Sequence, residues 1–303
     1  MVIPAYGSGA KPSVWQPEDL EELRMLRNRL NGSFCYAAGT TLLRTQWEGG
    51  LVPSPEHMIS LARIPGTSDV YMDGDRMVIG ALTRLNRCIT DELLHHLPLL
   101  QEAVKTIAAP SIRNVATIGG NIVSGVGDTL PALLTYNAEL QWMTDEGLEF
   151  RTLDSWLRGG RDGSRNPSDV LISIQIPLNK LPVSNPKNQE PDTRKITFFR
   201  KLGRRETFSA SLVTIAFRGE IDTDGRWKKV AIAAGGGSGA AMRLPASEQL
   251  LLREEASLMQ AEPLGRTASA EFVTYGDVFA TEQYRKQTAG NLLGAGLWEA
   301  LYR

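Results

Sequence analysis

The sequence predicts an α+β fold in two parts. Up to residue 182, short apolar runs typical of strands are mixed with segments of helical periodicity. After residue 193, three strand-like runs come first and helical patterns follow them, and this separation indicates α+β architecture. Residues 178–193 are rich in proline, asparagine and lysine and show no hydrophobic period. We therefore expect two domains, at residues 1–182 and 193–303.

The first part opens with a helix and then a strand that ends in small residues. Pro17 and acidic residues precede apolar periodicity that continues to Leu30, a pattern typical of a helix start. Residues 34–38 have the composition of a short strand, and residues 40–47 suit a helix directly after it. The positive N-terminal end of that helix is expected to face the small residues between them.

Turn residues and prolines mark the other elements of the first part. Asp73-Gly74-Asp75 is a turn sequence, and Pro110 ends an apolar helical segment. We expect strands at 58–61, 77–81, 139–143 and 170–176, and helices at 98–108 and from 128 onward.

The second part is expected to hold three strands and then helices. These strands are expected at 194–200, 211–218 and 227–234, and the helices from 247 and from 281 onward. Residues 235–239 form a glycine cluster after the third strand. No lysine or acidic partner supports a nucleotide site there, so a flexible loop is favoured.

The composition is that of a soluble globular protein, with 42% hydrophobic and 22% charged residues. A formal net charge of −1 gives no reason to expect a nucleic-acid or acidic-membrane surface. The N-terminus lacks a basic segment followed by an apolar core, and no window approaches the roughly 18 apolar residues of a membrane span. We expect a cytoplasmic protein that binds neither nucleic acid nor a membrane.

The cysteines and histidines do not suggest a metal site. Cys35 and Cys88 cannot hold an iron–sulfur cluster, which takes about four thiolates, and we expect both to be plain buried residues. His57 stands alone, and the adjacent His95 and His96 point to different sides. We predict no metal site and no catalytic acid–base residue in this chain.

Two segments rich in glycine and small residues carry the functional signal. Residues 110–122 read PSIRNVATIGGNI, and residues 36–43 read YAAGTTLL. Adjacent glycines let a backbone approach a ligand because no Cβ blocks the way. Successive exposed N–H groups in such turns form a concavity for oxygen anions, usually phosphate. Two such loops suit the diphosphate of a dinucleotide, although neither is a Rossmann or P-loop fingerprint.

With Asp128 and the Pro-Ala-Leu-Leu that follows it, these segments resemble the FAD-binding subunit of molybdenum hydroxylases. That family includes the flavoprotein subunits of xanthine dehydrogenase and of carbon monoxide dehydrogenase. The likeness spans nearly the whole chain, and Thr-Ile-Gly-Gly-Asn at residues 117–121 is its most specific signal. Residues 198–205 are similar to the family's aromatic-Lys-x-x-x-Arg segment, and residues 275–285 resemble the Asp…Tyr-Arg opening of its last helix.

The resemblance implies a PCMH-type FAD-binding domain of two α/β lobes, then a smaller domain with a three-stranded antiparallel sheet and a helix bundle. It also implies an electron-transfer subunit that works with a large molybdenum-cofactor subunit and a small two-iron two-sulfur subunit. A complex of xanthine dehydrogenase type, with NAD as the electron acceptor, is favoured. Carbon monoxide, nicotinate, aromatic acyl and aldehyde dehydrogenase complexes are alternatives, and a non-catalytic scaffold that has lost FAD is another.

The resemblance also implies a set of FAD-binding residues in both loops and at single positions elsewhere. They are Tyr36, Ala37, Ala38, Gly39, Thr40, Thr41, Leu42, Leu43, Ile107, Thr117, Ile118, Gly119, Gly120, Asn121, Asp128, Leu171, Arg200 and Lys201. Ile107 and Leu171 are equally well explained as core residues, and a threonine in the first loop as a helix cap.

Four of these residues leave alternatives open. By resemblance Asp128 bonds ribose or ribityl hydroxyls, but the loop between it and Asn121 is shorter than is usual in the family, and Asp128 also suits a helix cap. Arg200 and Lys201 compete for a cation beside the flavin, which would stabilise negative charge on its reduced form. Ala38 stands where the family commonly has glycine, and its methyl group fits if φ is negative.

Overall fold

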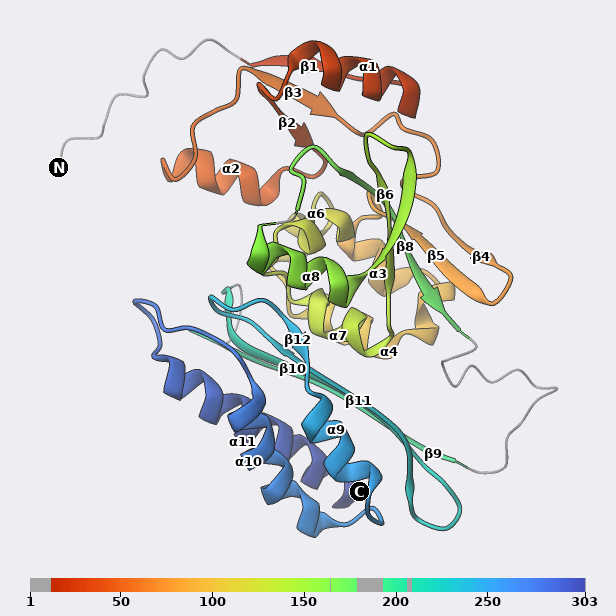
Figure 1. The fold of residues 1–303 in the computed structure, drawn as a ribbon, viewed down its shortest axis with the longest axis vertical. Helices are drawn as coiled ribbons and strands as arrows, with labels where there is room; N and C mark the ends of the chain where they lie inside the picture. Colours follow the sequence, from red (N-terminus) through yellow and green to blue (C-terminus); the bar gives the residue numbers. More distant parts are fainter. Residues whose placement is uncertain (1–11, 164, 179–192, 206–208, 303) are drawn as a thin grey trace.

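The computed structural model describes residues 12–163, 165–178, 193–205 and 209–302. These residues form three sheets, two of which divide the first domain into lobes, while the third belongs to the second domain (Figure 1). The expected α+β class is therefore confirmed. Most of the expected boundary segment lies outside the described residues, so the two domain limits stay a prediction.

The first lobe is a small parallel sheet with two helices. Its strands are, in spatial order, β1 (Ser13–Trp15), β3 (His57–Ser60) and β2 (Phe34–Ala37). Helix α1 (Leu20–Leu30) begins at Asp19, whose carboxylate accepts the N–H of Glu22. Helix α2 (Thr41–Glu48) follows β2 almost directly, as its sequence predicts.

The second lobe is an antiparallel sheet whose strands are, in spatial order, β4 (Val70–Asp73), β5 (Arg76–Gly80), β8 (Val170–Pro177), β6 (Glu139–Met143) and β7 (Leu148–Thr152). The predicted turn at Asp73-Gly74-Asp75 joins β4 to β5. Its helical segments are α3 (Leu85–Thr90), η1 (Leu93–His96), α4 (Pro98–Lys105), α5 (Pro110–Arg113), α6 (Ile118–Val123), α7 (Thr129–Thr135) and α8 (Leu153–Asp162). The sequence did not predict β1, β4, β7, α3 or α8. The predicted helix at 98–108 ends early, and Ala108 has a left-handed φ of 44° that no helix continues.

The second domain has the predicted antiparallel sheet and helices. Its strands are, in spatial order, β12 (Met242–Arg243), β11 (Trp227–Gly235), β10 (Ser211–Ile221) and β9 (Arg194–Gly203). The helical segments are α9 (Pro245–Leu252), η2 (Leu258–Gln260), α10 (Ala261–Glu271) and α11 (Glu282–Tyr302). The two-residue strand β12 adds an edge to the three strands that the sequence predicts.

The second-domain sheet is buried on both faces (Figure 1). Phe199, Ala216 and Ala233 pack into the core of the second lobe. Their neighbours Phe198 and Phe217 pack into a separate core with α9, α10 and α11. Because successive strand residues point to opposite faces, one sheet serves both cores.

The glycine cluster after β11, where the sequence favoured a flexible loop, is closely packed against other parts of the chain. Gly236 and Gly237 have φ of 88° and 71°, values that favour glycine. A Cβ on Gly237 would lie 1.8 Å from the Arg285 guanidinium, and one on Gly239 would lie 2.9 Å from the Val273 carbonyl oxygen. Close neighbours therefore require these glycines.

Among the described residues, every helix is too short or too polar to cross a bilayer. The same residues contain no cluster of three or more histidine, cysteine, aspartate or glutamate side chains arranged to hold a metal ion.

Candidate functional site

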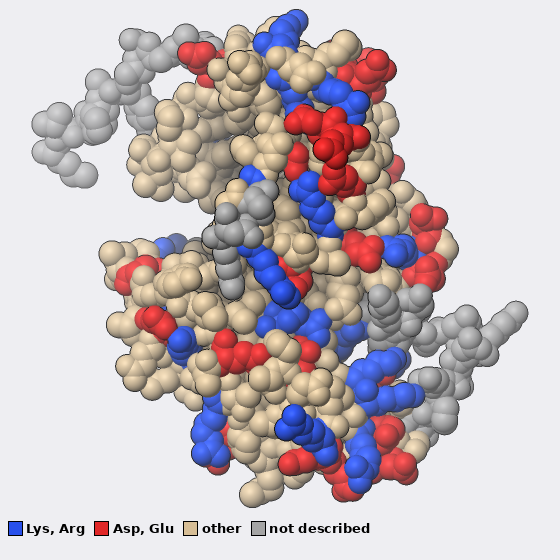
Figure 2. Space-filling view, viewed as in Figure 1, with Lys and Arg blue, Asp and Glu red and all other residues tan. Residues whose placement is uncertain are grey.

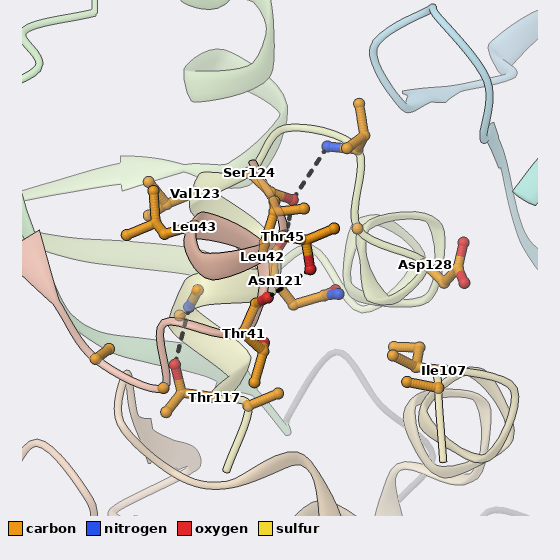
Figure 3. A pocket seen from close by; sticks show the side chains of 18 of the residues that line it. Thr41, Leu42, Leu43, Thr45, Ile107, Thr117, Asn121, Val123, Ser124 and Asp128 are labelled. Atoms are coloured by element: carbon orange, nitrogen blue, oxygen red, sulfur yellow. Dashed lines mark hydrogen bonds between the residues drawn. The ribbon is translucent and has the colours of Figure 1, made fainter. Parts of the chain in front are cut away.

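A cavity of about 1120 Å³ lies where the two lobes and the second domain meet. It is visible as a hollow at one side of the molecule, between the upper and lower parts (Figure 2). Pockets for drug-sized ligands occupy about 300–1,000 Å³, so this cavity suits a larger ligand. Figure 3 draws Thr41, Leu42 and Leu43 from α2 among the residues that line this cavity, together with Thr117, Asn121 and Asp128.

The first loop presents unpaired backbone donors to this cavity. Helix α2 begins after Thr40, whose side chain makes no capping hydrogen bond. Within the described chain, the N–H groups of Thr41, Leu42 and Leu43 have no hydrogen-bond partner, as is usual for the first turn of an uncapped helix. All three residues line the cavity, so the positive end of an eight-residue helix is available to an anion.

The backbone strain of the first loop lies at Thr40. Its φ of 52° is left-handed, a region that β-branched residues rarely adopt. Ala38, by contrast, is not among the residues with positive φ, so its methyl group fits without strain. Ala108 is a second left-handed residue that lines the cavity. Such strain is concentrated at ligand sites in many proteins.

The second glycine segment differs from its prediction. Gly119 and Gly120 lie in the first turn of α6, not in an open loop. The N–H of Ile118 donates to the Thr83 carbonyl, that of Gly119 to the Ala81 carbonyl, and that of Gly120 to the Thr117 hydroxyl, at 2.9, 2.8 and 3.1 Å. The expected concavity of free N–H groups was therefore wrong here, because the protein itself satisfies these donors.

Packing explains two of the glycines. A Cβ on Gly119 would lie 2.6 Å from the Ala81 carbonyl oxygen, and one on Gly39 would lie 2.2 Å from the Val115 carbonyl oxygen. Gly39 thus lets the two segments touch each other. Gly120 is exposed, and its Cβ would meet only the Thr117 hydroxyl, at 3.1 Å.

Asn121 caps the helix that Asp128 was considered to cap. The Asn121 Oδ1 atom accepts the N–H and the hydroxyl of Thr129, at 3.2 and 2.6 Å. Asp128 occupies the N-cap position of α7 but makes no capping hydrogen bond. The capping alternative for Asp128 was therefore wrong.

Asp128 instead joins the two domains at the cavity wall. Its Oδ2 lies 2.6 Å from Lys201 Nζ, and its Oδ1 accepts the Ser211 hydroxyl at 2.5 Å. The side chains of Asp128 and Lys201 are only 10% and 11% exposed. Lys201 Nζ also donates to the Thr106 carbonyl at 3.0 Å. This set forms a buried charge pair with additional hydrogen bonds, the condition for tolerating such a pair.

The two candidate cations, Arg200 and Lys201, lie on opposite faces of β9. Lys201 lines the cavity. Arg200 does not, because alternation along β9 turns it the other way, where its guanidinium pairs with Glu299 at 2.6 Å and lies over the Phe198 ring. Arg200 is thereby removed from the candidate cations.

Most other predicted site residues lie together. The cavity-lining ones are Tyr36, Ala38, Gly39, Thr40, Thr41, Leu42, Leu43, Ile107, Thr117, Gly119, Gly120, Asn121, Asp128, Leu171 and Lys201. Ala37 and Ile118 do not line it, because both point into the interior, at 7% and 0% exposure.

The sequence did not predict Ser211 and Arg204 among the lining residues, and Cys35, expected to be a plain buried residue, is half-buried and lines the cavity. Burial raises the pKa of the Cys35 thiol, which keeps it protonated, and the fully buried Cys88 has a pKa raised to about 12 by burial. The Asp…Tyr-Arg resemblance contained a signal for Asp277 and Arg285, which also line the cavity. No sequence signal marked Ser211.

Comparison with known proteins decides the family. Residues 9–179 match the family described as the FAD binding domain in molybdopterin dehydrogenase. The chain belongs to the FAD-binding subunits of molybdenum hydroxylases. Residues 197–300 of this flavoprotein subunit match the carbon monoxide dehydrogenase flavoprotein C-terminal domain. The expected family, its class as an oxidoreductase subunit and its cofactor, FAD, are thus confirmed.

Similar proteins serve different enzymes. The flavoprotein subunit is 26% identical to 6-hydroxypseudooxynicotine dehydrogenase complex subunit alpha of Paenarthrobacter nicotinovorans, over 82% of this chain and 81% of that protein. It is 24% identical to the xanthine dehydrogenase FAD-binding subunit of Escherichia coli O157:H7, over 68% of each. A chain of carbon monoxide dehydrogenase from Hydrogenophaga pseudoflava has the same fold, with a TM-score of 0.84, 24% identity and coverage of 96% of this chain and 98% of that one.

Proposed function

We propose that this subunit carries FAD in the cavity and passes electrons through it to NAD, in a complex of xanthine dehydrogenase type. A small two-iron two-sulfur subunit would supply the electrons, and a large molybdenum-cofactor subunit would oxidise the organic substrate. The likeness to a xanthine dehydrogenase FAD-binding subunit over 68% of the chain supports the type of complex. The observation that carries the role itself is the cavity wall, with free N–H donors at α2 and a buried cation at Lys201.

The residues of the wall fit FAD by their chemistry. The N–H groups of Thr41, Leu42 and Leu43 would hold the diphosphate, whose charge the N-terminal end of α2 stabilises. Lys201 would face negative charge on the flavin, and Ile107 and Leu171 would give apolar contact. When bound, FAD supplies the chemistry of accepting single electrons and releasing a hydride.

The protein contributes position and charge rather than proton transfer. No histidine is among the described residues that line the cavity. The Asp128 carboxylate is occupied by Lys201 and Ser211, so it is not free to act as a base. This agrees with a subunit whose substrate oxidation takes place in a partner chain.

The cofactor content of the purified chain tests the first half of this proposal. We expect about one non-covalent FAD per chain, because no histidine lines the cavity as an attachment point and Cys35 is a protonated thiol. Denaturation should release FAD. A colourless chain that does not take up FAD would refute the role, and release of FMN would refute the dinucleotide.

Electron-transfer assays test the second half. The chain alone should reduce an artificial dye with NADH and should not oxidise a purine or an aldehyde. Co-expression with the large and small subunits should give a complex that oxidises a purine with NAD. Loss of only the NADH reaction would argue for another acceptor, and purine oxidation by this chain alone, free of molybdenum and iron, would overturn the subunit role.

A further inference from the structure

A chain of buried polar contacts leads from the last helix to the cavity. Arg285, in the first turn of α11, is fully buried. Its Nη2 pairs with Asp277 Oδ2 at 2.6 Å, and its Nη1 donates to the Leu212 carbonyl at 2.7 Å. The N–H of Phe279, with that of Ala280, holds the pKa of Asp277 below its usual range, so its carboxylate stays charged beside Arg285.

The Leu212 carbonyl, which accepts the hydrogen bond from Arg285, belongs to a β-bulge. The pairing of β10 with β9 shifts between Ser211 and Val213, which leaves Leu212 as the extra residue. Bulges re-aim the side chains beside them and are common near active sites. Gly237 fixes the other side of this bulge, because its N–H donates to the Ser211 carbonyl at 2.9 Å.

The bulge turns Ser211 toward the first domain. Its hydroxyl donates to Asp128 Oδ1, while Asp128 Oδ2 holds Lys201 Nζ. An ammonium group has three donors. Two of the three N–H donors of the Lys201 ammonium are bonded to Asp128 and to the Thr106 carbonyl, so one donor remains for a ligand in the cavity.

We propose that Ser211 and Arg285 are positioning residues for Lys201. Arg285 fixes the Leu212 bulge, the bulge aims Ser211 at Asp128, and Asp128 then holds the Lys201 ammonium at one place in the cavity wall. A fixed charge stabilises a developing charge more than a mobile, hydrated one, since it needs no reorganisation. The proposal rests on the proposed function, because it assigns Lys201 to the reduced flavin.

The test is the two-electron midpoint potential of FAD bound to the full-length Ser211→Ala chain. We expect the preference for reduced over oxidised FAD to fall about tenfold, which is about 30 mV for a two-electron couple. The affinity for oxidised FAD should change less than about threefold. Ser211→Thr, which keeps the hydroxyl, should restore the potential.

Two further variants sharpen this result. Ser238→Ala is the matched control, since Ser238 follows Gly237 directly but does not line the cavity, and its hydroxyl donates to the Tyr275 carbonyl instead of Asp128. It should leave the potential unchanged. Arg285→Lys keeps the charge but loses the fork that reaches both Asp277 and Leu212, so it should lower the potential as Ser211→Ala does. If Arg285→Lys does not fold, the two serine variants decide the question.

Crystal structures of the unliganded variants give a readout that does not depend on FAD. Lys201 Nζ should leave Asp128 in Ser211→Ala and stay beside it in Ser238→Ala. An unmoved lysine, an unchanged potential in Ser211→Ala, or an equal drop in Ser238→Ala would each overturn the positioning role. A wild-type chain that binds no FAD would instead refute the proposed function, while the lysine position would still decide the structural step.

Discussion

The two glycine-containing segments look alike in sequence and differ in what they offer a ligand. The segment at 36–43 leads into α2 and leaves the N–H groups of Thr41, Leu42 and Leu43 without a partner in the described part of the chain. The segment at 117–121 opens α6 with the N–H groups of residues 118–121 already bonded inside the protein. Phosphate-binding capacity therefore follows from unpaired donors at a helix start rather than from glycine content. Four substitutions test this difference.

The largest effect is expected from Gly39→Val, which disrupts the contact between the first glycine segment and residues 115–116. Its Cβ would lie 2.2 Å from the Val115 carbonyl oxygen and 2.9 Å from Ala116 Cα. We expect a loss of about 3 kcal/mol in the free energy of unfolding, together with loss of FAD. Thermal unfolding and FAD content measure the two effects. An unchanged melting temperature would show that the segments do not touch.

Gly119→Val should destabilise the fold by about 1–3 kcal/mol, since its Cβ would lie 2.6 Å from the Ala81 carbonyl oxygen. Unfolding of the FAD-free chain should reveal this loss, because the contact is within the protein. If the FAD-free chain keeps its stability and only FAD binding is lost, then the second segment does face the diphosphate.

Leu42→Glu should separate binding from stability at the first segment. Leu42 lies in the first turn of α2 and is 46% exposed. A carboxylate there stabilises the helix by about 0.3–1 kcal/mol but repels a diphosphate at the same donors. We expect about tenfold weaker FAD binding without a loss of melting temperature. Leu42→Gln is the neutral control, and equal affinities of the two variants would contradict the assignment.

The smallest effect is expected from Gly120→Ala. Its Cβ would meet only the Thr117 hydroxyl, at 3.1 Å, and Gly120 is exposed. Both the FAD dissociation constant, from fluorescence titration, and the melting temperature should stay close to those of wild type. A large loss of affinity would mean that the diphosphate lies against this glycine.

Local sequence predicted the parts of the site that depend on neighbours along the chain. The strand before Ala38 and the helix after Thr40 follow from composition and periodicity, and the structure confirms both elements. The left-handed φ of Thr40 was not predictable, because threonine rarely adopts it and only the surrounding packing enforces it. The sequence correctly marked Gly39 and Gly119 as important, but for a different reason. Carbonyl groups from distant parts of the chain, not a ligand, leave no room for a Cβ at these positions.

The contacts around Lys201 could not be predicted, because they join elements far apart in the chain. Ser211 meets Asp128 only after a one-residue bulge shifts the register of β10, and short windows of sequence contain no sign of that bulge. Strand β1 was missed for another reason, since three residues are too few to show a period.

The sheet that is buried on both faces has a consequence for how the subunit is made. Its strands close the core of the second lobe with Phe199, Ala216 and Ala233, and the helical core with Phe198 and Phe217. Without this sheet, neither the second lobe nor the helices of the second domain have a complete apolar core. A truncated chain that ends before β9 would therefore expose an aggregation-prone surface. Because α11 completes the helical core and its Arg285 lines the cavity, we expect the whole subunit to fold, and its cofactor to bind, only after α11 has left the ribosome.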